Sequence, residues 1–140
     1  WCRTHFLSAR LLDQAARISR QLEGYLARFG YSRSELASSC GRDASPLQRC
    51  LVSGLFANVA RRSGPAGGSY RLLRGGETVD VHPSSMYFGA DATPEYVVFA
   101  SAMATTKAYI QGVTAVDPGW LTELAPSYFS ACNPLPGWPL

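Results

Sequence analysis

Apolar side chains recur at intervals of three and four residues near the start of the chain, which is the period of an α-helix. They are Leu11, Leu12, Ala15, Ile18, Leu22, Tyr25, Leu26 and Phe29. Arginines and acidic residues take most of the positions between them, and Gly30 stands where a left-handed residue commonly ends a helix. The pattern predicts an amphipathic helix over residues 8–29.

A second helical pattern follows a serine-rich stretch. Residues 32–45 hold few large apolar side chains and are typical of a mobile surface connection. Ser45 and Pro46 have the form of an N-cap followed by proline in the first turn. The apolar face that follows consists of Leu47, Cys50, Leu51, Leu55, Phe56 and Val59. A helix over residues 46–62 is expected, with two arginines at its end complementing the helix dipole.

The period changes from helical to alternating after the glycine-rich run at residues 63–68. The next segment indicates a strand, a Gly-Gly turn and a second strand. In that second strand Val79 and Val81 point to one side, and Thr78, Asp80 and His82 point to the other. This alternation is typical of a sheet with one buried face.

The remaining elements are short. A helical turn is expected from Pro83, residues 95–116 favour two further strands, and a last helix begins at Asp117 and Pro118 and runs to Leu124. Pro126 ends that helix, and the proline-rich end of the chain favours a flexible tail. The chain is therefore predicted to be an α+β protein with two helices, four or five short strands and a C-terminal helix.

Composition limits what such a chain can be. Its 140 residues are 46% hydrophobic, enough for one core or for a helical unit packed on a small β unit. Thirteen basic against ten acidic residues give +3, too small a surplus to identify a nucleic-acid binder. Twelve of the cations are arginine, whose planar fork suits carboxylates, phosphates and stacked bases. A coding bias towards GC would produce the same excess, and both explanations stay open.

Several classes of chemistry are disfavoured. The four cysteines, Cys2, Cys40, Cys50 and Cys132, are widely spaced without a C-x-x-C pair, so no metal site is expected. Because Cys50 falls in the apolar pattern of a helix, we expect a reduced intracellular protein. No phosphate-binding G-x-x-x-x-G-K-[ST] loop occurs, and neither histidine belongs to a recognisable catalytic triad. No catalytic residue is predicted.

No apolar run approaches the roughly 18 residues that a membrane span needs. The chain opens on WCRTHF without an initiator methionine or a signal-peptide pattern. We therefore expect a piece of a longer, soluble protein that does not contact a membrane.

The single lysine of the chain, Lys107, stands in a segment that favours an extended conformation. Alternation would place Thr105, Lys107, Tyr109 and Gln111 on one face and Ala108, Ile110 and Gly112 on the other. The first set combines donors, a cation and an aromatic ring, a mixture that can follow a phosphate backbone and stack on bases. A strand that simply faces solvent would carry similar residues, so the pattern alone leaves both interpretations open.

A second feature concerns the run from His82 through Pro83 to Ser84. A histidine followed by proline and serine can form a hydrogen-bonded corner that fixes the exit of the chain from a strand. We favour this structural role over catalysis.

Several runs together resemble a known family. They are WCRTHF, RCLVSGLFANVARR, YRLL, VDVHPSSMYF and TTKAYIQGVTAVDPGWLTELAPSYF, in this order. The resemblance is to the C-terminal end of DEAH-box RNA helicases of the pre-mRNA-splicing group, and it covers roughly residues 1–129. The HPSS run followed by TTK-x-Y and W-L-x-E-L-A-P is its most specific part.

The resemblance implies a fold and a division into domains. It identifies residues 1–64 as the end of a helical bundle with two amphipathic helices and a linker, residues 65–126 as an OB-fold, and residues 127–140 as a proline-rich tail. The fold class implied is α+β, with a helical-bundle segment followed by a small OB-fold-like antiparallel β-barrel and a short C-terminal helix.

The resemblance also implies a function. Members of the family couple ATP hydrolysis in two RecA-like domains to movement along single-stranded RNA, so ATP and Mg would bind outside this chain. The module would line the RNA channel and pack on the RecA-like and winged-helix domains of its own protein, in the nucleus. The alternative is a protein-interaction or autoregulatory surface for G-patch proteins, other spliceosome components or the helicase core.

The family pattern T-[ST]-K-x-Y maps onto Thr105, Thr106, Lys107 and Tyr109. Lys107 is thus the first candidate for a phosphate contact, with the two threonines, Tyr109 and Gln111 as its neighbours in the RNA site. The chain departs from the family pattern at Gln111, where members often carry an arginine, and at Ser101, where they often carry an acid. In one interpretation the arginine and the acid of the family pair with each other, and both are absent here. If the arginine contacts RNA instead, this chain binds RNA less tightly.

Overall fold

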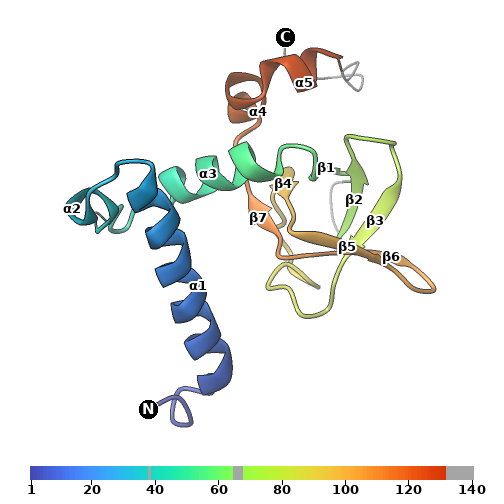
Figure 1. The fold of residues 1–140 in the computed structure, drawn as a ribbon. Helices are drawn as coiled ribbons and strands as arrows, with labels where there is room; N and C mark the ends of the chain where they lie inside the picture. Colours follow the sequence, from blue (N-terminus) through green and yellow to red (C-terminus); the bar gives the residue numbers. More distant parts are fainter. Residues whose placement is uncertain (38, 65–67, 132–140) are drawn as a thin grey trace. The chain divides into compact units, whose positions relative to one another are not determined.

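The structure is a computed structural model that describes residues 1–37, 39–64 and 68–131. The chain divides into two compact units, Trp1–Gly41 and Arg42–Leu140. Figure 1 shows the helices and strands of both units. The domain boundary expected at residue 64 falls inside the second unit.

The first unit is built on one long helix, α1 (Ala9–Arg28), as predicted. Ser8 caps its start by accepting a hydrogen bond from the N–H of Leu11. At the other end Gly30 has a φ of 92°, the left-handed conformation that was expected of it. None of the residues of α1 is buried, so its apolar stripe remains exposed.

The connection after α1 is more ordered than the sequence suggested. Residues 33–36 form a short helix, α2 (Arg33–Leu36), inside the stretch predicted to be irregular. Its start is a capping box in which the N–H of Ser32 donates to Glu35 Oε2 at 2.7 Å and the N–H of Glu35 donates back to Ser32. The hydrogen bonds from Ser32 also lower the pKa of Glu35. The S-x-x-E spacing carried this signal in the sequence.

The second predicted helix is shorter than expected. Helix α3 runs over Ser45–Leu55, and strand β1 (Val59–Arg62) follows it, so Arg61 and Arg62 lie on a strand rather than in a last helical turn. The strand forms because Val59 and Ala60 are buried and pair with neighbours on both sides. Tertiary pairing thus overrides the local helical pattern.

The buried face of α3 also differs from the predicted one. Val52 is fully buried and Leu55 and Phe56 pack beside it, whereas Leu47, Cys50 and Leu51 are exposed. The expectation of a buried Cys50 was therefore wrong. An exposed Cys50 does not support the intracellular location that was inferred from its burial.

Six more strands complete one sheet. They are β2 (Ser69–Leu72), β3 (Thr78–Val81), β4 (Tyr96–Val98), β5 (Ser101–Ala104), β6 (Ala108–Gln111) and β7 (Thr114–Ala115). The hairpin of β2 and β3 around Gly75 and Gly76 confirms the predicted strand, turn and strand. Residues 95–116 form four strands instead of two, since the extended chain is interrupted at 99–100, at 105–107 and at 112–113. The run from Pro83 forms turns but no helix.

The sheet has the order β5-β6-β3-β2-β1-β4-β7. All neighbours are antiparallel except β3 and β6, which run parallel. In the described part of the chain, the outermost strands β5 and β7 do not pair with each other. The predicted antiparallel barrel is therefore a mostly antiparallel, open sheet.

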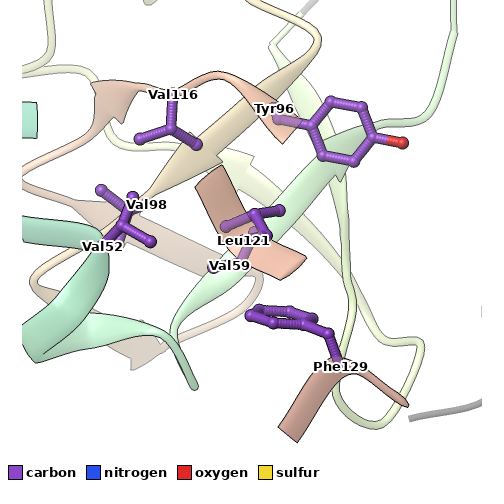
Figure 2. Close-up of a cluster of buried hydrophobic side chains, with 7 residues drawn as sticks. All are labelled: Val52, Val59, Tyr96, Val98, Val116, Leu121 and Phe129. Atoms are coloured by element: carbon purple, nitrogen blue, oxygen red, sulfur yellow. The ribbon is translucent and has the colours of Figure 1, made fainter. Parts of the chain in front are cut away.

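Two hydrophobic cores lie on opposite faces of this sheet. One consists of Ala60, Tyr70, Val79, Val81, Val97, Phe99 and Ile110. The other, drawn in Figure 2, consists of Val52, Val59, Tyr96, Val98, Val116, Leu121 and Phe129. Because successive residues of a strand point to opposite sides, β1 and β4 contribute to both cores.

Helices cover the second core. Helix α4 (Pro118–Leu124) starts at Asp117, whose side chain accepts a hydrogen bond from the N–H of Gly119 at 2.7 Å, as the Asp-Pro pair predicted. Pro126 does end α4, but it also begins a further helix, α5 (Pro126–Ala131). The predicted tail is thus helical at its start, and its remaining residues 132–140 lie outside the described residues.

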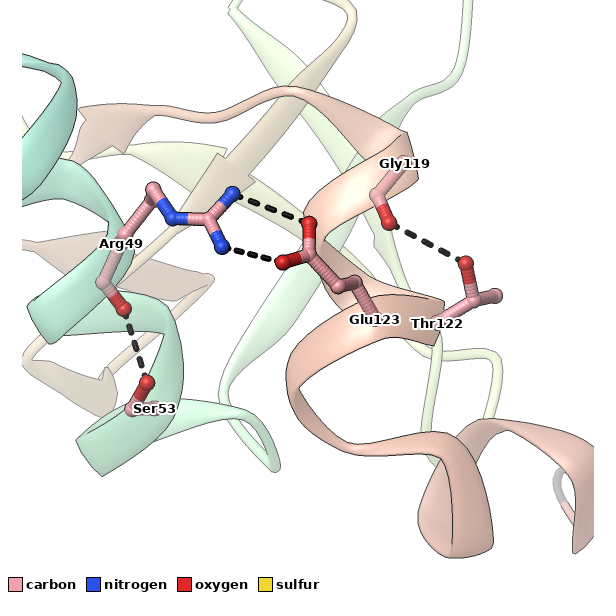
Figure 3. A network of polar contacts seen from close by, with 5 residues as sticks. All are labelled: Arg49, Ser53, Gly119, Thr122 and Glu123. Carbon is pink, nitrogen blue, oxygen red and sulfur yellow. Dashed lines mark hydrogen bonds and ion pairs between the residues drawn. The ribbon is translucent and has the colours of Figure 1, made fainter.

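An arginine on α3 joins that helix to α4. Arg49 Nη1 lies 3.0 Å from Glu123 Oε2, and its second amino group contacts the other carboxylate oxygen (Figure 3). The guanidinium carbon lies 5.7 Å from the centre of the Trp120 ring. The Arg49 hydrogen bond lowers the pKa of Glu123 below its ordinary value of 4.5. None of the described helices has the length and the apolar character needed to cross a membrane.

The lowered pKa of Glu123 predicts an acid-dependent loss of stability. A carboxyl with a depressed folded-state pKa stabilises the fold above 4.5, and this contribution disappears as the pH falls through the lower folded value. We expect the Glu123→Gln variant to melt below the wild-type protein at neutral pH, with the gap closing on acidification below 4.5. Thermal unfolding across this pH range measures the difference in melting temperature between the two proteins. A difference that does not change with pH would contradict the lowered pKa of Glu123.

The backbone conformation at position 112 is predicted to require glycine. Its φ is 63°, and a Cβ added there would lie 2.7 Å from the Cβ of Ala100. Gly112→Ala should destabilise the protein by on the order of 1–3 kcal/mol in urea unfolding. Gly54→Ala is the matched control, since nothing lies within 4 Å of a Cβ at that helical position. It should leave stability unchanged or raise it by up to about 1 kcal/mol.

Candidate nucleic-acid interface

One face of the sheet is covered by helices over only part of its width. The pairings Ser69 with Asp80, Asp80 with Tyr109, and Tyr109 with Met103 place these four residues on one face. Register also puts them on the face that carries Val59 and Tyr96 of the helix-covered core, yet Ser69 and Met103 are exposed. We call the uncovered part the open polar face: Ser69, Asp80, His82, Met103, Lys107, Tyr109 and Gln111.

Lys107 reaches this face from a bend rather than from a strand. Strand β6 begins at Ala108, and residues 105–107 form the tip of the β5–β6 hairpin. Thr105 closes the tip, with its N–H donating to the carbonyl of Lys107 at 2.9 Å and its hydroxyl donating to the same oxygen at 3.2 Å. The expectation of a lysine within a strand was wrong, and Thr105 and Thr106 are exposed residues of the same tip.

The expected alternation holds from Ala108 onward. Ile110 is fully buried in the core that contains Tyr70 and Val97, and Ala108 packs beside it. Tyr109 and Gln111 are partly exposed on the other side of the strand. Gly112 leaves the pattern because of its positive φ. The hairpin thus brings Lys107, Tyr109 and Gln111 together at one end of the open polar face.

The ammonium group of Lys107 has an acidic neighbour. Its Nζ lies 3.6 Å from Asp80 Oδ2, and the lysine side chain is 67% exposed. The other oxygen of Asp80 accepts a hydrogen bond from the Ser69 hydroxyl at 2.6 Å. Alternation in the sequence places Asp80 on the polar side of its strand, but only the parallel pairing of β3 with β6 reveals its contact with Lys107.

His82 forms the corner at which β3 ends. Its Nδ1 accepts a hydrogen bond from the N–H of Ser84 at 3.1 Å and lies 2.8 Å from the Ser84 hydroxyl. Its own N–H donates to the carbonyl of Ile110 at 3.0 Å, which ties the corner to β6. Pro83 is exposed between the two partners.

The His82 ring also has a defined orientation. It meets the Tyr109 ring edge to face, with centroids 5.8 Å apart and an interplanar angle of 82°. Because a backbone N–H can only donate, Nδ1 must be the acceptor, and the proton of the neutral ring must sit on Nε2. His82 therefore offers an N–H donor beside the Tyr109 ring.

Gln111 lies across the hairpin from Ser101, since the two are register partners on β6 and β5. Its amide nitrogen contacts the sulfur of Met103 at 3.6 Å. An arginine and an acid at positions 111 and 101 would thus face each other, which fits the interpretation of a mutual pair.

Charge is divided unevenly between the two units. Residues 1–41 hold six arginines and three acids, so they carry the whole surplus of +3. Residues 42–140 hold seven cations and seven acids and are formally neutral. Any attraction of a polyanion to this face of the sheet is therefore local. Register places the exposed Arg71 of β2 on the same face as Ser69, so the local positive charge comes from Arg71 as well as from Lys107.

Side chains that could bind a metal ion do not gather in the part of the chain that the structure describes. Within the described residues, no group of three or more His, Cys, Asp and Glu side chains could hold a metal ion. Cys2, Cys40 and Cys50 are free thiols.

The family model described as "Oligonucleotide/oligosaccharide-binding (OB)-fold" matches residues 47–128, from α3 to α5. The chain belongs to this family. The match begins well before residue 65, so α3 and β1 are within it.

Curated relatives narrow the class further. The pre-mRNA-splicing factor ATP-dependent RNA helicase DEAH10 of Arabidopsis thaliana is 39% identical over 133 residues, covering 95% of this chain and 17% of that protein. The probable ATP-dependent RNA helicase DHX35 of Homo sapiens is 38% identical over 129 residues, covering 92% of this chain and 17% of the relative.

A third relative agrees with these two. The pre-mRNA-splicing factor ATP-dependent RNA helicase prp22 of Schizosaccharomyces pombe is 35% identical over 133 residues, covering 95% of this chain and 11% of that protein. The chain thus spans at most 17% of the length of these relatives. It is a helicase-associated OB-fold domain whose homologues are DEAH-box RNA helicases, some of them named as splicing factors.

The two histidines are predicted to hold opposite neutral tautomers. His82 should carry its proton on Nε2, because Ser84 donates to Nδ1. His5 should carry it on Nδ1, because that nitrogen lies 2.9 Å from the carbonyl oxygen of Trp1, which can only accept. Long-range proton–nitrogen NMR, at a pH well above the ordinary titration of histidine, distinguishes the two forms. A proton on Nδ1 of His82 would contradict the hydrogen bond that the N–H of Ser84 donates to that nitrogen.

Proposed function

We propose that this chain is an accessory module of a DEAH-box RNA helicase of pre-mRNA splicing, where its open polar face borders the path of single-stranded RNA. In this proposal Lys107 contacts a phosphate, and Tyr109, with the His82 ring beside it, offers an aromatic surface to a base. Thr105, Thr106 and Gln111 supply further polar contacts along the backbone of the strand.

The observation that carries the proposal is the placement of Lys107. The sole lysine lies at the tip of a hairpin in an OB-fold domain, with its side chain largely exposed and two residues ahead of Tyr109 in the chain. The relatives that share 35–39% of its residues are named as RNA helicases. A cation beside a ring is the arrangement that single-stranded nucleic acids bind.

The rest of the helicase would supply the energy. We propose that ATP and Mg bind in RecA-like domains outside this chain, that the module packs on those and on a winged-helix domain, and that the protein works in the nucleus. The residues of this chain then do no hydrolysis; they hold and orient the strand while the motor acts on it.

A second candidate function rests on the first unit. The apolar side chains of α1 are exposed, including Leu11 at 63% and Leu22 at 53%. A helix with such a stripe is normally covered by a partner. A protein-interaction or autoregulatory surface, for a G-patch protein, a spliceosome component or the helicase core, would cover it. The two candidates differ in whether Lys107 matters for RNA binding.

The RNA role predicts the effect of removing the lysine. Lys107→Ala in the full-length protein should weaken the binding of a single-stranded oligonucleotide. It should also lower the dependence of log affinity on log salt, by at most about 0.7, the value for one phosphate on a single strand. Fluorescence anisotropy at several salt concentrations measures both. An unchanged slope would remove Lys107 from the RNA site and favour the protein-interaction function.

Two control variants make this test specific. Lys107→Arg keeps a cation at the tip and should retain most of the affinity. Arg42→Ala removes one charge at an exposed position ahead of α3 and should leave the slope unchanged. Equal losses in Arg42→Ala and Lys107→Ala would mean that net charge, not the hairpin tip, sets the affinity.

A further inference from the structure

Asp80 has no part in the RNA contacts proposed above, yet it is the residue closest to the charge on which they depend. We propose that Asp80 is an internal competitor of the RNA phosphate: its carboxylate holds the Lys107 ammonium when no RNA is bound and must give it up when a strand arrives. This inference rests on the proposed contact between Lys107 and a phosphate.

The fold fixes the carboxylate in place. Asp80 lies in β3 between β2 and β6, opposite Ser69 on one side and Tyr109 on the other. Ser69 donates to Oδ1 at 2.6 Å, so this oxygen is anchored and Oδ2 is left facing Lys107. Asp80 is 30% exposed, whereas Lys107 is 67% exposed. The acid is therefore the fixed partner of the pair, and the lysine is the movable one.

The pair has the properties of one that opens readily. Its separation of 3.6 Å is longer than that of a good charged hydrogen bond. The lysine side chain is flexible and mostly in water, where ion pairs contribute little. A phosphate can therefore take the ammonium without dismantling the sheet.

Opening the pair nevertheless lowers affinity, for two reasons. The phosphate must replace an existing partner of the lysine rather than meet a free cation. Once it has done so, the Asp80 carboxylate remains next to the bound strand with only the Ser69 hydroxyl on it, and like charges repel. Asp80 thus lowers the affinity of the hairpin tip for RNA and makes the bound strand easier to release.

The competition also changes the salt dependence of binding. When Lys107 moves from Asp80 to a phosphate, the RNA releases a counterion, while the uncovered carboxylate attracts a cation from solution. The net release of ions is smaller than one phosphate contact would give. Replacing Asp80 with a neutral residue should raise the net release of ions towards the value for one phosphate contact.

The experiment uses Asp80→Asn in the full-length protein, with a single-stranded oligouridylate as the probe. The variant should bind about two- to fivefold more tightly, the factor expected from one exposed charge pair. Its salt slope should be steeper than that of the wild type. Unchanged affinity and slope would overturn the competitor role. Asp80→Thr, which suits a strand, provides a second neutral variant in case the asparagine disturbs the fold.

A double variant separates competition from simple repulsion. In the Lys107→Ala background, Asp80→Asn should give a smaller gain than in the wild type, because no ammonium is left to be freed. An equal gain in both backgrounds would show that Asp80 only repels RNA, and would overturn the proposal. Glu77→Gln, a loss of the same charge at an exposed position before β3, should give no gain.

Failure of this inference is distinguishable from failure of the proposed function. If Lys107→Ala weakens binding and lowers the salt slope but Asp80→Asn changes nothing, the phosphate contact stands and the competitor is rejected. If Lys107→Ala itself has no effect on RNA binding, the phosphate contact is rejected and the competitor falls with it.

Discussion

The burial of strands β1 and β4 on both faces is the constraint on which the second unit depends. Val59 and Val98 belong to the core under the helices, and their neighbours Ala60 and Val97 belong to the core on the other side. A single pair of strands thereby joins the core under the helices to the core on the other face of the sheet. Everything that presents the open polar face, from the β2–β3 hairpin to the β5–β6 hairpin, is attached through these strands.

Elements whose evidence was local could be predicted from the sequence. The long first helix, the Gly-Gly hairpin and the Asp-Pro start of α4 each had a periodic pattern or a cap within a few residues. Strand β1 was missed because its residues continue a helical pattern, and only pairing with β2 and β4 makes them extended. The parallel contact of β3 with β6 joins segments far apart in the chain, so nothing local could indicate it.

The same distinction applies to the candidate site. Alternation correctly separated Ile110 from Tyr109 and Gln111, because it depends only on the strand period. The position of Lys107 in a bend, and its contact with Asp80, depend on where the hairpin turns and on which strand lies next to it. The roles of these residues towards RNA rest on the proposal, supported by the family and the relatives, and not on the geometry alone.

The uneven cover of the sheet has an evolutionary consequence. The outward side chains of β3, β5 and β6, such as Asp80, Ser101 and Gln111, belong to neither hydrophobic core. Substitution there removes no side chain from either core, so this surface can diverge while the scaffold beneath it stays the same. The exchange of a charged pair for Ser101 and Gln111, suggested by the family pattern, occurs in this permissive region. If this face binds RNA as proposed, helicases that share one scaffold would in this way differ in how tightly each holds its substrate.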